Sequence, residues 1–268
     1  MNIAILGGGN LGTAIARGIT EKALYKREQV YITCRNTARL EKMKAEGFRV
    51  TAANDEAIRN SGVIVISVLP QQLNEVLQAI RDEIDPVKHT VISIVTGVSV
   101  ADLRQQLGPE VPIVRAMPNT AIAIGESMTC IASDDSSAPE AIALTRTIFD
   151  AVGKTLVIKE EQMLAATALC ACGIAFFLRA IRAASQGGIE ISFHAEEALM
   201  MAAQTAKGAA GLLTEQFSHP EHEIDKVTSP RGCTIAGLNQ MEHHGFSSAM
   251  IRGIVTSAEK AGNLYKTD

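Results

Sequence analysis

Tryptophan is absent from this sequence, and aromatic residues make up only 4% of its 268 positions. Proteins that bind single-stranded nucleic acid stack the bases on such rings. Basic residues are not in surplus either, because the formal net charge is −4 at pH 7. The composition lacks the aromatic and electrostatic features of a nucleic-acid-binding protein, so we expect no nucleic-acid partner.

Cysteines are few, and their number is odd. The five are Cys34, Cys130, Cys170, Cys172 and Cys233. An odd count without regular spacing argues against a disulfide framework and fits a reducing cytoplasm. Cys170 and Cys172 lie in an apolar run with no histidine or acid close by in sequence. We therefore interpret them as small packed residues and expect no metal site.

The sequence also shows no clear targeting or membrane segment. The N-terminus reads MNIAILGGGN, with no basic stretch ahead of its apolar residues, which is unlike a secretory signal peptide. The longest uncharged run is 162–178, close to the lower limit of about 17 residues for a membrane span, and small residues interrupt it. We expect a cytoplasmic protein without membrane contact, in which this run is a helix buried in protein.

The first half of the chain alternates between two patterns. Apolar runs typical of strands occur at 3–6, 30–33, 63–68, 90–95 and 113–117, and helix-patterned stretches between them include 12–22, 37–45 and 71–80. Strand and helix in alternation predict βαβ units and a parallel sheet. The run VIVISV is continuously apolar, as a strand covered on both faces should be. We predict a Rossmann-type doubly wound domain over 1–156.

The second half contains no convincing strand and is predicted to be an all-helical domain over 157–268. One helix face is marked by Leu199, Ala203, Ala206, Ala210 and Leu213, spaced 4, 3, 4 and 3 apart. Ser192 is the candidate N-cap of that helix, and a last helix is expected over 247–264. The apolar run and the alanine face are too extensive for about 110 residues to cover, which predicts at least a homodimer.

A glycine motif directly follows the first strand. Gly7, Gly9 and Gly12 have the G-x-G-x-x-G spacing and open a helix. Gly7 allows a tight turn, Gly9 lets a pyrophosphate approach the backbone, and Gly12 lets helix and strand pack closely. The helix N-terminus supplies amide donors for phosphates. Strand, turn and helix in this order predict a dinucleotide site.

The second strand ends without the acid that usually binds the ribose of NAD. Arg35 stands there instead, 23 residues beyond Gly12. A guanidinium suits a 2′-phosphate through bidentate hydrogen bonds, which favours NADPH, with NADH possible. A solvated surface arginine is the alternative interpretation.

Three further stretches end strands and are candidates for a ligand cleft. SVLPQQ at 67–72 and VTGV at 95–98 follow buried strands, whose carboxyl ends are where doubly wound sheets bind ligands. VRAMPNTAIAIGES at 114–127 also follows a strand and contains the turn signal Pro118–Asn119, and residue chemistry alone does not distinguish a functional turn from a structural one.

Four stretches together resemble the pyrroline-5-carboxylate reductase family. They are GGGNLGTAIARG, RAMPNT, AAQTAKGAAGLL and TSPRGCTIAGL, in the family's order and spacing over nearly the whole chain. The resemblance implies reduction of the cyclic imine L-1-pyrroline-5-carboxylate to L-proline with NAD(P)H, the last step of proline biosynthesis. It also implies a helical domain that interlocks with a second subunit, in a dimer or a larger ring.

The resemblance implies the site residues as well. The cofactor-binding candidates are Gly7, Gly9, Asn10, Leu11, Gly12, Arg35, Asn36, Asn54, Ser67, Val68, Leu69, Pro70, Ile94, Val95 and Thr96. The substrate-binding candidates are Glu160, Arg231, Gly232, Cys233 and Thr234, and Thr234 is the catalytic candidate. Free amides at the start of the helix after Gly232 suit a substrate carboxylate, and the Thr234 hydroxyl can hydrogen-bond the ring nitrogen.

This chain departs from the usual family pattern at several positions. CACGIA at 170–175 replaces Ser-Gly-Ser-Gly-Pro-Ala, and Leu69, Ala121, Arg231 and Cys233 also differ. Two alternatives therefore stay open. One is a related NADPH-dependent imine reductase with another small carboxylated substrate, and the other is a dinucleotide-binding regulatory protein without turnover.

Overall fold

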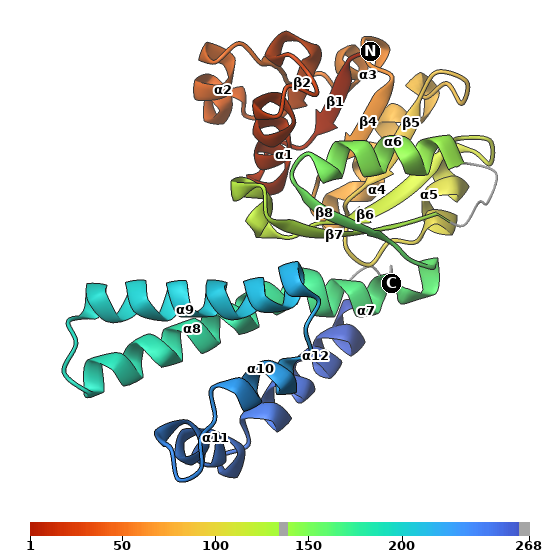
Figure 1. Cartoon of the computed structure of the whole chain (residues 1–268). Coiled ribbons are helices and arrows are strands. Elements are labelled where there is room, and N and C mark those ends of the chain that lie inside the picture. The colour runs from red at the N-terminus through yellow and green to blue at the C-terminus, as the bar shows by residue number, and fades with distance from the viewer. Residues whose placement is uncertain (134–138, 263–268) are drawn as a thin grey trace. The chain divides into compact units, whose positions relative to one another are not determined.

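A computed structural model describes residues 1–133 and 139–262, and it divides into two compact units (Figure 1). The first unit comprises residues 1–174 together with the C-terminal stretch that begins at Ser257. The second unit is Ala175–Thr256.

Among the described residues, the first unit contains one eight-stranded sheet (Figure 1). Its strands are β1 (Ile3–Leu6), β2 (Val30–Thr33), β3 (Arg49–Thr51), β4 (Val63–Ile66), β5 (Thr90–Ser93), β6 (Ile113–Met117), β7 (Ser127–Ala132) and β8 (Gly153–Val157). The spatial order is β3-β2-β1-β4-β5-β6-β7-β8, and all neighbours are parallel except β6 and β7. The strand order reverses beside β1, which makes this the predicted Rossmann-type doubly wound sheet.

Helices cover both faces of the sheet because successive strand residues point to opposite sides. Ile3 and Ile5 belong to one core cluster, with residues of α1 (Asn10–Glu21), α2 (Glu41–Ala45) and α6 (Pro139–Asp150). Ala4 and Leu6 belong to the other, with residues of α3 (Asn54–Arg59), α4 (Pro70–Ile80) and α5 (Val100–Leu107). Every residue of β1 and of β4 is buried, as the continuous apolar runs predicted.

The sequence located the central strands well and missed the edges. Three of the five predicted strands have the bounds that the structure shows, and the other two end two residues earlier, at Ile66 and Ser93. The edge strands β3 and β8 were not predicted, because they are partly exposed and lack a continuous apolar run. β7 was missed as well, since Ser127 and Thr129 interrupt its apolar pattern.

Past Val157, the described residues form helices, as expected. The short segments η5 (Glu160–Gln162), α7 (Met163–Ala166) and the π-helix η6 (Thr167–Cys172) come first. Then follow α8 (Gly173–Glu190), α9 (Ala195–Gln216), α10 (Pro220–Lys226), α11 (Cys233–His243) and α12 (Phe246–Ala261). The last helix was expected over 247–264, and 263–264 lie outside the described residues.

The prediction that Ser192 caps α9 is wrong. Ser192 lies in the preceding turn with φ +86°, whereas the N-cap residue is His194, in extended backbone. The backbone amide of His194 donates to Glu197 Oε2 at 3.1 Å, so the acid at the third helical position closes the cap. A capping residue needs extended backbone, which the left-handed conformation of Ser192 does not provide.

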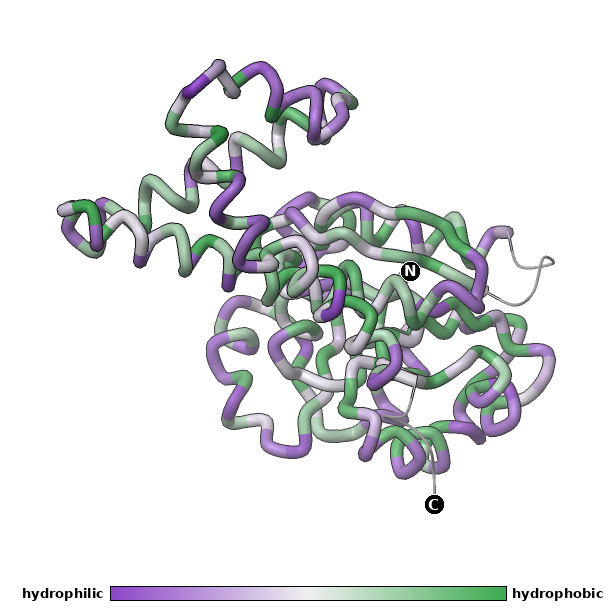
Figure 2. The backbone as a smooth tube through the Cα atoms, turned by 90° about the horizontal axis from the view of Figure 1, so that it is seen from below, coloured by the Kyte–Doolittle hydropathy of each residue, from purple (hydrophilic) through white to green (hydrophobic). Residues whose placement is uncertain are grey.

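Apolar residues, green in Figure 2, occur along the helices of the second unit, and several of their side chains are exposed. Phe177, Leu178 and Met200 are 61%, 58% and 68% exposed. The helical stretch Glu160–Glu190 is long and apolar enough to cross a membrane by length and composition, and 22% of its most apolar window is buried. Within one chain, the expected burial of 162–178 is therefore incomplete.

Candidate active site

The turn after β1 is shaped by two glycines that no other residue can replace without overlap. Gly7 has φ +117°, and a Cβ there would overlap the carbonyl oxygen of Ser67. A Cβ on Gly12 would overlap the carbonyl oxygen of Gly7. The amides of Gly7 and Gly8 donate to Thr33 O at 3.2 and 2.8 Å. The turn is thereby fixed against β2 and β4, the neighbours of β1.

Gly9 differs from these two glycines because it faces open space. A Cβ built on it would meet no atom within 4 Å. Gly9 is the N-cap of α1, and no side chain caps the helix there. The first amides of a helix lack partners within the helix, so Asn10, Leu11 and Gly12 offer donors to an external acceptor. An open helix N-terminus of this kind suits the pyrophosphate of a dinucleotide.

The strand register brings the other candidate cofactor residues to the same edge of the sheet. Ser67 N donates to Leu6 O at 2.8 Å, Ile94 N to Ile66 O at 3.1 Å, and Cys34 N to Thr51 O at 3.1 Å. The carboxyl ends of β1, β2, β4 and β5 therefore lie side by side, as expected for a ligand-binding edge.

The candidates at this edge present different groups to a ligand. Ser67, Val68, Pro70 and Thr96 are half-buried, and Pro70 is the first residue of α4. Leu69 is 64% exposed, whereas Ile94 and Val95 are buried. Ile94 and Val95 therefore have only their backbone to offer a cofactor. Asn54 is the first residue of α3, which follows β3.

Arg35 is exposed just past the end of β2. Its Nη1 lies 4.0 Å from Glu75 Oε2, and both side chains are about three-quarters exposed. Such a surface pair contributes little, so the guanidinium can exchange this partner for a phosphate. Asn36 has a structural contact instead, because its Oδ1 accepts from Ala38 N at 3.2 Å and caps a 3₁₀ turn.

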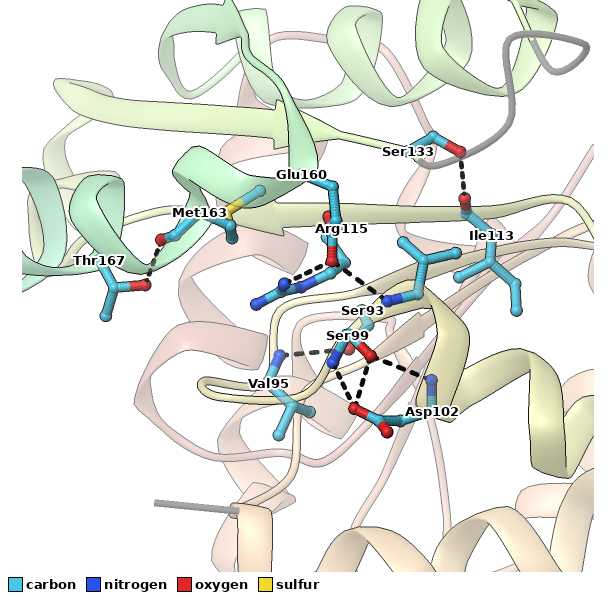
Figure 3. Close-up of polar contacts among 11 residues, drawn as sticks. Ser93, Val95, Ser99, Asp102, Ile113, Arg115, Ser133, Glu160, Met163 and Thr167 are labelled. Carbon is cyan, nitrogen blue, oxygen red and sulfur yellow. Dashed lines mark hydrogen bonds and ion pairs between the residues drawn. The ribbon is translucent and has the colours of Figure 1, made fainter. Parts of the chain in front are cut away.

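Glu160 forms an ion pair with the buried Arg115, the first residue of RAMPNT, for which no individual role was predicted (Figure 3). Arg115 Nη1 lies 2.7 Å from Glu160 Oε1, and the Arg115 side chain is 5% exposed. The same oxygen accepts from Val100 N, the first amide of α5, at 3.2 Å. The carboxylate thus joins β6, α5 and η5, directly after the turn 95–99. The signal in the sequence was a lone arginine within the apolar run IVRAM.

This ion pair is incompletely satisfied within the described residues. Arg115 Nε and Nη2 and Glu160 Oε2 are buried and have no hydrogen-bond partner. A buried polar atom without a hydrogen bond lowers the free energy of unfolding, so each such atom in a folded protein needs an explanation. A direct contact of Glu160 with substrate stays a prediction.

The remaining substrate candidates belong to the helical unit and surround the start of α11. Gly232 is its N-cap, with no side-chain cap, and Gly232 N donates to Ser229 O at 2.9 Å. Arg231 has φ +61°, a left-handed conformation that glycine adopts far more easily. Cys233 is exposed and Thr234 half-buried, at the first and second positions of the helix.

Comparison with known proteins identifies the family. Pyrroline-5-carboxylate reductase 1 of Dictyostelium discoideum is 52% identical over 98% of this chain, and this chain spans half the length of that relative. Pyrroline-5-carboxylate reductase of Synechocystis is 35% identical over 99% of both chains. The chain belongs to the pyrroline-5-carboxylate reductase family.

Domain models and a solved structure agree with this membership. The model for pyrroline-5-carboxylate reductase dimerisation matches 160–264, and the model for the coenzyme F420-dependent NADP oxidoreductase matches 2–97. The Plasmodium falciparum pyrroline carboxylate reductase, solved with NADP bound, has a TM-score of 0.90 at 25% identity and covers 99% of this chain and 98% of its own. The first unit therefore contains the dinucleotide-binding fold of this family.

Proposed function

We propose that this protein reduces L-1-pyrroline-5-carboxylate to L-proline with NADPH. The observation that carries the proposal is the open N-terminus of α1 at Gly9, on the ligand-binding edge of the sheet, in a chain of this family. We further propose that 1–156 bind the dinucleotide, and that 157–268 supply substrate contacts and the dimer interface.

On the cofactor side, the backbone amides at Gly9–Gly12 bind the pyrophosphate. Arg35 binds the 2′-phosphate, and Asn36 and Asn54 lie near the adenosine ribose. The nicotinamide half lies along 67–70 and the backbone of 94–96. Bound NADPH supplies the hydride that adds to the imine carbon. The protein holds that carbon within reach and excludes water from it.

On the substrate side, the start of α11 binds the carboxylate. The amides of Cys233 and Thr234 lack partners within the helix and lie at its positive end, where an anion is stabilised. Arg231 adds positive charge to this loop, and the Thr234 hydroxyl holds the ring nitrogen, which carries a proton in the product. Hydride addition to an imine needs no strong base, and positioning supplies the catalysis.

Arg115 and Glu160 position the turn 95–99. The Glu160 carboxylate fixes the first amide of α5, and a capping box between Ser99 and Asp102 fixes the same helix end, with Ser99 N donating to Asp102 Oδ2 at 2.9 Å (Figure 3). Two independent contacts thus hold the helix start directly after the nicotinamide-lining residues.

We also propose that the protein works in the cytoplasm as at least a homodimer, in which exposed apolar residues such as Phe177 and Leu178 are covered. Exposed apolar patches on soluble proteins often mark protein–protein interfaces. A larger ring built from such dimers is compatible with this surface.

The test is oxidation of NADPH by the purified protein, followed at 340 nm with pyrroline-5-carboxylate, with L-proline measured as the product. We expect stoichiometric loss of NADPH and formation of proline. Turnover only with other cyclic imines would favour the related imine reductase. Binding of NADPH without turnover of any imine would favour the regulatory protein.

A further inference from the structure

Two thiols from distant parts of the chain meet in the first unit. Cys130 lies on β7 and Cys170 lies 40 residues later in the π-helix η6, with 3.9 Å between their Sγ atoms. Both are free thiols in the structure. A separation of 3.9 Å places the sulfurs in contact without a covalent bond.

The two thiols differ in access. Cys130 is 3% exposed and packs in a small core cluster with Met117, Met163 and Ala166. Cys170 packs against the edge of this cluster and is half-buried. Cys170 is therefore the more accessible of the two thiols, and Cys130 is covered.

The contact also makes the thiols chemically unequal. A hydrogen bond from the Cys130 thiol lowers the pKa of Cys170 to about 7, against the opposing effect of its burial. The same hydrogen bond, with desolvation, raises the pKa of Cys130. The lowered pKa means that Cys170 is thiolate more often near neutral pH than an ordinary cysteine is. The thiolate is the nucleophilic form of cysteine.

We propose that Cys130 and Cys170 form a dithiol site that hydroperoxides oxidise to an intramolecular disulfide. The Cys170 thiolate attacks one peroxide oxygen, the O–O bond breaks, and Cys170 becomes a sulfenic acid while hydroxide leaves and is protonated to water. The Cys130 sulfur then attacks the Cys170 sulfur, and the sulfenic hydroxyl leaves as water with the Cys130 proton. Two thiols lose two electrons, and one hydrogen peroxide becomes two waters.

The local backbone suits this reaction. The sulfurs must approach from 3.9 Å to about 2.05 Å, and Cys170 lies in a π-helical segment, a form that is rare and concentrated at functional sites. The carbonyl of Cys170 accepts from Asn119 Nδ2 at 3.1 Å. Asn119 follows β6, which runs parallel to β5, so the thiol pair lies beside the ligand-binding edge of the sheet.

The experiment treats the reduced full-length protein with a small excess of hydrogen peroxide, blocks the remaining thiols with N-ethylmaleimide and digests the protein without reductant. Trypsin cleaves after Lys159 and Arg179, so Cys170 and Cys172 share one peptide. The variant Cys172→Ser is therefore the matched control. We expect mass spectrometry to find the Cys130 peptide linked to the 160–179 peptide in wild type and in this control, and dithiothreitol to release the link.

Removal of the resolving thiol tests the order of steps. In Cys130→Ala we expect no crosslink and a Cys170 sulfenic acid that dimedone traps, whereas wild type yields little adduct. The proposal is overturned if Cys172→Ser abolishes the crosslink, or if the wild-type crosslink joins other cysteines or two chains. It is also overturned if wild type and Cys130→Ala trap equal amounts of dimedone at Cys170. If Cys130→Ala fails to fold, the crosslink in wild type and in Cys172→Ser decides the proposal.

Discussion

Replacement of Gly9 by alanine should weaken NADPH binding and leave the free energy of unfolding nearly unchanged. The added Cβ would meet no protein atom within 4 Å, and Gly9 has φ −82° and ψ −169°, which alanine adopts without strain. The methyl group would instead occupy the open space beside the N-terminus of α1, of which Gly9 is the N-cap. If a pyrophosphate binds there, the substitution disturbs the ligand and leaves the protein intact.

The expected change in the free energy of unfolding is close to zero. Alanine is a poorer N-cap than glycine, which costs about 0.5–1 kcal/mol. Alanine also restricts the unfolded chain, which stabilises the folded state by about 0.4–1 kcal/mol. The two effects oppose each other, so urea unfolding should give a difference within about 0.5 kcal/mol of wild type.

The expected change in NADPH affinity is much larger. Forcing a methyl group into a packed contact costs typically about 1–3 kcal/mol. That corresponds to a dissociation constant raised roughly five- to hundredfold, measurable by the fluorescence of bound NADPH.

Gly12→Ala is the comparison variant, because its Cβ would overlap the carbonyl oxygen of Gly7 and should lower the free energy of unfolding by several kcal/mol. Unchanged NADPH affinity in Gly9→Ala would show that the pyrophosphate does not bind at this turn. A large fall in the free energy of unfolding of Gly9→Ala would show that the space beside Gly9 is not open.

Four further outcomes are expected. Arg35→Ala should lower kcat/KM with NADPH roughly ten- to hundredfold and leave NADH unaffected, and an equal loss for both would mean that Arg35 stacks on adenine. Arg231→Gly should relieve the left-handed φ of +61° and raise the free energy of unfolding by about 1 kcal/mol in urea. A rise in its KM for the imine would show that Arg231 contacts the carboxylate. Thr234→Ala should lower kcat by more than about tenfold with little change in NADPH affinity, and unchanged kinetics would remove Thr234 from the mechanism. Sedimentation at micromolar concentration should show a dimer or larger, and a folded, active monomer would contradict the proposed interface.

The sequence by itself determined the centre of the first unit. Buried parallel strands need continuous apolar runs, so β1, β2 and β6 could be located to the residue. The G-x-G-x-x-G spacing encodes a local requirement, since turn, cap and close packing all lie within Gly7–Gly12. The change to helices past Val157 was equally readable, because helical periodicity is local in sequence.

Only the tertiary structure decided which distant residues meet. Arg115 and Glu160 are 45 residues apart, and Cys130 and Cys170 are 40 residues apart. No local sequence pattern therefore predicts that either pair is in contact. The edge strands β3 and β8 depend on hydrogen bonds to neighbours more than on their own apolar residues. His194 caps α9, and the predicted Ser192 does not, because the turn places Ser192 in left-handed backbone. In each case the deciding interaction is set by how the chain turns and packs, whereas periodicity and spacing report only what a residue's close neighbours in sequence require.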